Sequence, residues 1–136
     1  MKTEPETFSY EDLARDGRAV WDLVRNYTAR NNLKAMKVGE QAFVYHSVGP
    51  KSIVGICEIV REYYPDAKAA AEGEPDDRWV AVDVKPVRKL KRPVTLAQVK
   101  AHKILNNMML VKQSRLSVCP VTDAEWAEVL ALAGET

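Results

Sequence analysis

Residues 41–63 carry the sequence QAFVYHSVGPKSIVGICEIVREY, and this stretch decides the fold class. Residues 41–47 are too apolar for a strand with one solvent-facing side, and residues 53–63 form a second, longer run of strand-forming residues. The turn residues 48–51 separate the two runs, which predicts an antiparallel hairpin. Gly55 within the second run indicates a bulge or a close approach of another backbone or side chain.

Two more strands are predicted downstream of this hairpin. Residues 79–87 alternate in polarity and place Val80, Val82, Val84 and Pro86 on one face, while Pro86 favours a position at the sheet edge. Residues 109–118 are predicted to form a further strand that ends at Pro120. Residues 67–77 are small and acidic, which is typical of a surface loop.

Capping signals predict four helices. Ser9 with Asp12 opens a short helix that ends at Gly17, and Asn26 caps a helix over residues 27–37. Thr95 with Gln98 and Thr122 with Glu125 open two more. The apolar stripes expected to face the core are Ala29, Leu33 and Met36 in the second helix and Trp126, Val129 and Leu130 in the last.

Short strands at hairpin spacing, with helices between and around them, predict an α+β fold, expected to be a small mixed β-barrel. With 136 residues the chain is long enough for one domain, residues 1–136, with a core that needs neither disulfides nor a metal.

The composition restricts the possible functions. Lys and Arg number 20 against 19 Asp and Glu, so contacts with nucleic acid must come from local basic patches. No apolar run reaches the ~18 residues of a membrane span. We therefore expect a soluble, cytoplasmic monomer, or a nuclear one in a eukaryote. Cys57 and Cys119 lack metal-ligand spacing and are expected to be buried, reduced thiols, and no cofactor is expected.

The sequence offers little basis for catalysis. His46 and His102 are the only histidines, and neighbouring His46 and Ser47 would point to opposite faces of a strand. The sequence contains no Gly-rich phosphate loop and no metal-spaced cluster. We therefore expect a protein that is not an enzyme.

Several segments resemble the EVE domain family, in order from Met1 to about Leu132. The most specific is WDLVRNYTARN at residues 21–31. The others are KTEP at residues 2–5, YHS at 45–47, YPD at 64–66 and RLSV at 115–118.

This resemblance implies a PUA-like pseudobarrel, related in architecture to YTH and ASCH domains, that reads modified bases, notably modified cytosines in DNA. It also implies that Trp21 walls the base pocket. Two departures from the family pattern stand out. Met1 directly precedes Lys2, where the family usually has further residues that end in an aromatic and an apolar one, and Leu23 replaces the usual Gly. Because Met1 directly precedes Lys2, the first strand is expected to be short, or the start of the chain to be wrongly set. Because Leu23 replaces Gly, the pocket wall is expected to be narrower or to accept a different ligand.

Each candidate residue also has a simpler interpretation. Trp21 alone is more typical of a core residue, and Lys2, Thr3 and Ser47 are either base-pairing groups at strand ends or ordinary surface polarity. Tyr45 adds an aromatic ring to the candidate base site. Asn26 caps a helix or contacts the base. Arg25 forms an ion pair or binds a phosphate.

The sequence contains two basic clusters, and each is either a solvated face or a set of phosphate contacts. Arg30 and Lys34 belong to the first, together with Lys37. Lys89 and Arg92 belong to the second, together with Lys85, Arg88 and Lys91.

Three functions remain open. The leading one is a reader of modified bases in DNA. The second is an RNA reader of the YTH type, and the third is a sensor of a free nucleotide or similar small molecule.

Overall fold

The computed structural model describes residues 1–3, 9–22, 26–47, 51–66, 79–112, 116 and 118–134. In chain order the elements are β1 (Lys2–Thr3), α1 (Tyr10–Asp16), β2 (Ala19–Trp21), α2 (Tyr27–Ala35), β3 (Gln41–His46), β4 (Ser52–Pro65), β5 (Val80–Thr95), α4 (Leu96–Ala101), the 3₁₀ helix η1 (Leu105–Asn107), α5 (Met109–Lys112) and α6 (Asp123–Leu132).

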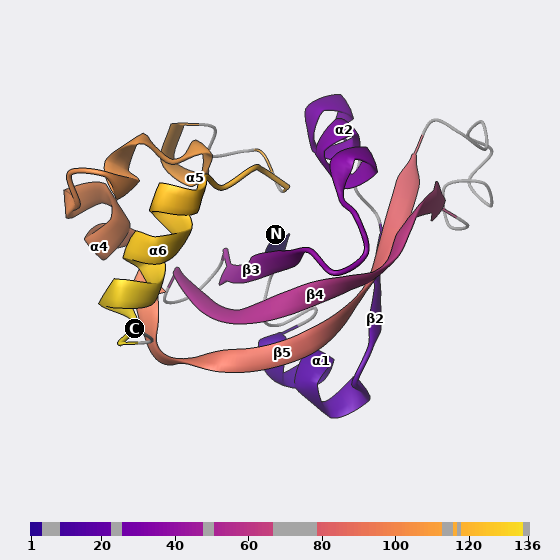
Figure 1. Ribbon diagram of the computed structural model, residues 1–136, viewed down its shortest axis with the longest axis horizontal. Helices are drawn as coiled ribbons and strands as arrows, with labels where there is room; N and C mark the ends of the chain where they lie inside the picture. Colours follow the sequence, from indigo (N-terminus) through magenta and orange to yellow (C-terminus); the bar gives the residue numbers. More distant parts are fainter. Residues whose placement is uncertain are drawn as a thin grey trace.

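The strands form one mixed sheet in the order β1-β3-β4-β5-β2. β1 runs parallel to β3, and the other neighbours are antiparallel. Figure 1 shows β4 and β5 as a long, curved pair, with α4, α5 and α6 gathered at one end and with α1 and α2 on either side of it in this view. The fold is therefore α+β, as the sequence predicts, and the predicted strands around residues 42–46, 53–60 and 79–84 share one sheet.

Side-chain alternation divides the core between the two faces of the sheet. Val80, Val82 and Val84 pack in one cluster with Trp21 and Leu33. Phe43 and Tyr45 point to the other face and pack in a second cluster, together with residues of α4 and α6. Met1, which precedes β1, and Trp21, which ends β2, both belong to the first cluster, so residues at the two edges of the sheet contribute to a single core. The closed pseudobarrel remains a prediction.

The capping predictions are confirmed. Ser9, Thr95 and Thr122 each accept a hydrogen bond from the backbone N–H three residues on, and each is the N-cap of a complete capping box. Asn26 caps α2 by accepting from the Ala29 N–H at 3.0 Å. α1 ends at Gly17, whose φ of 74° suits glycine. α2 ends two residues earlier than predicted, because the backbone of Met36 is already extended.

One sequence prediction of local structure is wrong, and one strand was missed. Residues 109–112 form α5 rather than the start of a strand, because Leu110 packs into the second core from a helical turn. β2 was not predicted at all, since its three residues are too few to show an alternating pattern. The predicted loop over residues 67–77 lies outside the described residues.

The predictions for Gly55 and Pro86 are confirmed. The β4–β5 register shifts between Ile53 and Gly55, and the Tyr10 ring packs directly on Gly55. Among the described strands, β2 pairs with β5 only from Val82 to Val84, so Pro86 lies where β5 has β4 as its one neighbour. In the described parts of the chain, no helix is both long and apolar enough to span a membrane.

Candidate nucleic-acid interface

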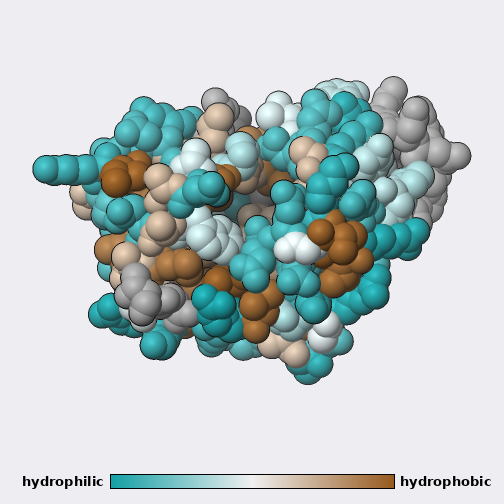
Figure 2. Space-filling view, in the orientation of Figure 1, coloured by the Kyte–Doolittle hydropathy of each residue, from teal (hydrophilic) through white to brown (hydrophobic). Residues whose placement is uncertain are grey.

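A cavity of about 660 Å³ opens beside β3. Its walls come from α2, from β3 and from the C-terminal part of the chain, including Asn32, Met36, Phe43, Cys119 and Trp126. Figure 2 shows this face hollowed between α2 and the C-terminal helices. The Asn32 side chain donates to the Val118 carbonyl at 2.6 Å, so α2 is tied to the C-terminal segment across the cavity.

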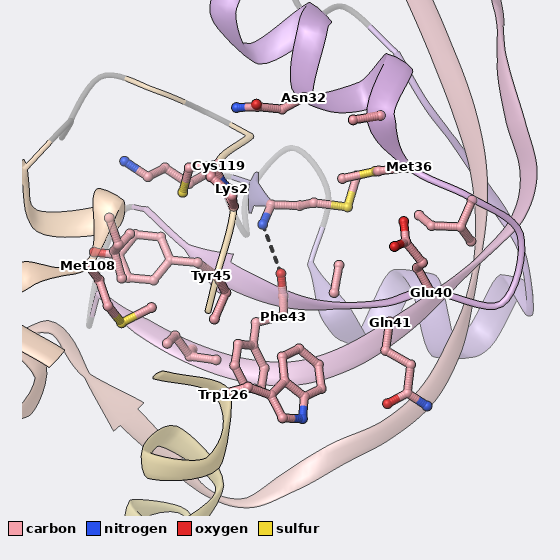
Figure 3. A pocket seen from close by; sticks show the side chains of 18 of the residues that line it. Lys2, Asn32, Met36, Glu40, Gln41, Phe43, Tyr45, Met108, Cys119 and Trp126 are labelled. Carbon is pink, nitrogen blue, oxygen red and sulfur yellow. Dashed lines mark hydrogen bonds between the residues drawn. The ribbon is translucent and has the colours of Figure 1, made fainter. Parts of the chain in front are cut away.

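Aromatic rings form one side of this cavity. Phe43 and Trp126 stack with their ring centroids 3.9 Å apart, and both are drawn in Figure 3. The Lys2 ammonium lies 5.9 Å from the centroid of the Tyr45 ring, and burial lowers the pKa of Lys2. Burial also raises the pKa of Tyr45, which therefore stays a neutral phenol at pH 7. Lys2 and Tyr45 are thus the two candidate base-binding residues that the structure places in this cavity.

The other candidates lie elsewhere. Trp21 ends β2, pairs with Val82 and is 8 % exposed, so its ring packs mainly in the core and does not line the cavity. Asn26 is occupied as the helix cap, and Arg25 lies outside the described residues. Thr3 pairs with His46, and Ser47 follows directly in the chain, so both residues lie at the same end of the β1–β3 pair. The candidate set is therefore divided between the β1–β3 end and the junction of β2 with α2.

Exposed aromatic rings with cations above them continue from this junction along α2. Tyr27 is 54 % exposed and stacks on Trp79 with centroids 5.0 Å apart, while the Arg30 guanidinium lies 4.9 Å from its centroid. Lys34 lies 5.6 Å from the ring centroid of Tyr63, which is also exposed. We call Tyr27, Arg30, Lys34 and Tyr63 the α2 face. Sequence reasoning found its cations and missed its rings: Tyr27 lies on α2 itself, whereas Tyr63 reaches α2 only through the fold.

The second basic cluster is partly neutralised. Lys89 forms an ion pair with Glu11, and Lys85 lies 3.4 Å from a Glu58 carboxylate oxygen. In the first cluster, Arg30 and Lys34 each lie over a tyrosine ring, and Lys37 lies 3.9 Å from a Glu62 carboxylate oxygen.

Comparison with known proteins places the chain in a family. The sequence model of the EVE domain family matches residues 1–132. The chain belongs to the EVE domain family. It is 41% identical to human thymocyte nuclear protein 1, over 97% of this chain and 72% of that protein. Its identity to the Gallus gallus protein of the same name is 40%, over 99% of this chain and 68% of that one.

Solved structures of similar proteins have the same fold as this EVE domain. A Pseudomonas putida protein superposes with a TM-score of 0.91 at 44% identity, over 98% of this chain and 97% of the other. The human THYN1 protein, crystallised in complex with DNA that contains 5-methylcytosine, superposes with a TM-score of 0.90 at 40% identity, over 100% of this chain and 96% of the other.

Burial and hydrogen bonding alter the titration of two potentially reactive side chains of this EVE domain, those of His46 and Cys57. His46 Nε2 accepts a hydrogen bond from the Tyr10 N–H at 3.1 Å, and burial lowers its pKa. Burial raises the pKa of the Cys57 thiol to about 11, so the thiolate is not formed at neutral pH. Cys119 is half-buried rather than fully buried as expected, and both cysteines are free. Within the described ranges, no three His, Cys, Asp or Glu side chains are grouped to hold a metal ion.

Proposed function

We propose that this EVE domain is a non-catalytic module that binds DNA and holds a modified base, with 5-methylcytosine as the first candidate. The observation that carries the proposal is its similarity to the human THYN1 protein, which was crystallised with DNA containing 5-methylcytosine. That similarity extends over the whole chain at 40% identity, which favours a shared ligand class.

In this proposal Trp21 provides an aromatic wall for the base. It ends β2 and belongs to the same core cluster as Ala29 and Leu33 of α2, the helix that carries Arg30 and Lys34. Stacking of a base on an aromatic ring contributes ~1–3 kcal/mol and tolerates different bases. Hydrogen bonds would then provide discrimination. The candidates that follow Trp21 in the chain are Arg25 and Asn26, and those at the β1–β3 end are Lys2, Thr3 and Ser47, with Tyr45 as a second ring.

The α2 face is proposed to contact the DNA backbone. Arg30 and Lys34 provide positive charge next to exposed rings, and phosphate contacts of this kind position a duplex without reading its sequence. Lys89 and Arg92 are the second phosphate-contact candidates. Since Lys89 is already paired with Glu11, we expect them to contribute less.

We also propose that the sheet closes into a PUA-like pseudobarrel, because Met1, which precedes β1, and Trp21, which ends β2, pack in one core. A monomeric state, and a cytoplasmic or, in a eukaryote, nuclear location remain expectations.

A binding screen tests the proposed function. Oligonucleotides of one sequence are prepared as DNA and as RNA, with unmodified cytosine or one of several modified cytosines, and free nucleotides serve as competitors. We expect tightest binding to modified DNA, with affinity that falls as salt rises because phosphate contacts release counterions. Preference for RNA would favour the YTH-like alternative. Tight binding of a free nucleotide with no salt dependence would favour a small-molecule sensor.

A further inference from the structure

The exposed aromatic rings of the described chain lie together on the α2 face. Within the described ranges, Tyr27 and Tyr63 are the aromatic residues with exposed side chains, and the other rings are buried or half-buried. Figure 1 shows α2 beside the end of the β4–β5 pair that lies away from α4, α5 and α6. Single exposed apolar side chains are common on protein surfaces, so it is the gathering of both rings on one face that indicates a binding surface.

The charge of this face is positive. The helix α2 contains no acidic residue, and Arg30 and Lys34 follow Tyr27 by three and seven residues, which places all three on one side of the helix. In β4 the neighbour of Tyr63 is Glu62, whose carboxylate lies 3.9 Å from the Lys37 ammonium rather than against the two ring-bound cations. The face is therefore complementary to a polyanion.

The Tyr27 ring and the Arg30 guanidinium are already ordered by their neighbours. Tyr27 stacks on the buried Trp79, and the Arg30 guanidinium lies 4.9 Å from the Tyr27 ring centroid. Arg30 donates from Nε and from Nη2 to the Asn31 side-chain oxygen, at 3.2 and 2.9 Å. Because ordered side chains lose little conformational entropy on binding, this arrangement favours the stacking of a flat partner.

The flat partner that also carries negative charge is a nucleic-acid strand with unpaired bases. Such bases stack on tyrosine rings and on guanidinium planes, while cations bind the phosphates of the same strand. A paired base presents only its edge in a groove, so exposed rings match bases that are not paired. Arg30 and Lys34 lie about 6 Å apart along the helix axis, close to the rise of about two stacked nucleotides of one strand.

We propose that the α2 face is a stacking platform for unpaired DNA bases, with Tyr27 and Tyr63 against the bases and Lys34 against a phosphate of the same strand. This inference rests on the proposed function, which supplies the unpaired bases: drawing one base out of a duplex breaks its pair and its stacking. Trp21, the proposed wall for that base, packs in one core cluster with Leu33 of α2. The same helix thus joins the site for the modified base to the platform for its neighbours.

Two single strands of equal length and equal charge test the platform. One is an oligothymidylate, and the other has abasic sites in place of the bases, so that it keeps the phosphates and lacks the stacking surfaces. Neither strand contains a modified cytosine, so the comparison does not depend on recognition of a modified base. Both are titrated, at one salt concentration, against the unmodified protein, Tyr27→Leu, Tyr63→Leu and a variant with Tyr27→Phe and Tyr63→Phe.

We expect the unmodified protein to bind the oligothymidylate at least about tenfold more tightly than the abasic strand. Tyr27→Leu and Tyr63→Leu should each weaken binding to the oligothymidylate at least about fivefold, because a stacking surface is lost, and change binding to the abasic strand by less than about twofold. The double phenylalanine variant keeps both ring faces and should bind both strands nearly as the unmodified protein does. Thermal unfolding identifies the folded variants, and Tyr63→Leu leaves the Tyr27–Trp79 stack in place.

Equal affinity of the unmodified protein for the two strands would overturn the platform, and so would equal losses for both strands in a folded leucine variant. A loss of the same size in the phenylalanine variant would also overturn it, because the rings would then not be the cause. If the platform pattern is found but methylated and unmethylated duplexes bind equally, the platform stands and the proposed modified-base function fails. If the duplexes are distinguished but the two single strands are not, the proposed function stands and the platform fails.

Discussion

Trp21 has two roles in this account, because the residue proposed to stack on a base is also packed in the core. Its ring lies in the first core cluster and is 8 % exposed, so part of its surface serves folding. From the sequence alone, the position before a helix cap was more typical of a core residue, and only the family resemblance indicated a pocket wall. Stability and binding must therefore be measured together at this position.

Replacing Trp21 with alanine should remove ~1–3 kcal/mol of DNA binding, a factor of roughly 5 to 150, together with the preference for the modified base. The same change should cost ~3–5 kcal/mol of unfolding free energy, because a buried aromatic ring is lost. Trp21→Phe retains a stacking face and should keep part of the affinity. Urea unfolding and DNA titration are run on the same samples. If the Trp21→Ala protein is folded and still prefers modified DNA, Trp21 is not part of the base-binding site.

Asp83 is a second residue with a defined physical role. Burial acts to raise its pKa, but the hydrogen bond from the Tyr64 hydroxyl and the ion pair with Arg18, 2.6 Å away, outweigh burial, and the net pKa is lowered. A lowered folded-state pKa means that ionised Asp83 stabilises the fold above the unfolded value of ~3.9. That stabilisation is lost as the pH falls through the folded-state pKa.

Asp83→Asn should therefore lower the unfolding free energy at pH 7 by about 1–3 kcal/mol, since hydrogen bonds to a charged, buried group are lost. The loss of stability between pH 4 and pH 2 should become shallower than in the unmodified protein. Urea unfolding across this pH range measures both effects. Asp16→Asn, at an exposed ion pair with Arg15, is the matched control and should change stability by no more than ~0.5 kcal/mol. If Asp83→Asn lost stability between pH 4 and pH 2 as steeply as the unmodified protein, this role would be contradicted.

The helices and strands that could be predicted from the sequence are those determined by interactions between residues close together in the chain. Ser9, Thr95 and Thr122 mark helix starts because their side chains bond backbone groups only three residues away. Long strands could be recognised by their apolar content. β2 was missed, and residues 109–112 were assigned to a strand, because a short apolar run fits either structure until its tertiary contacts select one.

The packing of α1 on β4 depends on Gly55. The Tyr10 ring occupies the space where a Cβ on Gly55 would lie, and the Tyr10 hydroxyl donates to the Ile56 carbonyl at 2.9 Å. Gly55→Ala should therefore cost about 1–3 kcal/mol of stability, as for other overpacked cores. In a Tyr10→Ala background the same change should cost much less, which a double-mutant cycle by urea unfolding measures. An equal cost in both backgrounds would show that the ring does not set the need for glycine.

At the scale of the whole molecule, the net charge of +1 provides little general attraction to DNA. The location of the cations therefore matters more than their number. The sequence identified both basic clusters, but it could not show that Lys89 is paired with Glu11 while Arg30 and Lys34 lie over tyrosine rings. Nor could it predict the cavity, whose lining comes from the N-terminus, α2, β3 and α6, segments that are distant in the chain.

Arg30→Gln with Lys34→Gln should weaken binding to modified and unmodified DNA by the same factor and reduce the slope of log affinity against log salt by about 1–2, because phosphate contacts do not depend on base identity. Lys89→Gln with Arg92→Gln is the matched pair and should have a smaller effect. Titrations at several salt concentrations measure both pairs. If the second pair lost more DNA affinity than the first, β5 rather than the α2 face would be the element that contacts the DNA backbone.

The most direct test of the central claim is a titration of the unmodified protein with two DNA duplexes that differ only in one methyl group on one cytosine. Both are measured at the same salt concentration, with free 5-methylcytidine as a competitor. We predict that the methylated duplex binds at least about tenfold more tightly, which corresponds to ~1.4 kcal/mol, and that this ratio persists as salt weakens both complexes. Equal affinity for the two duplexes at every salt concentration would contradict the account.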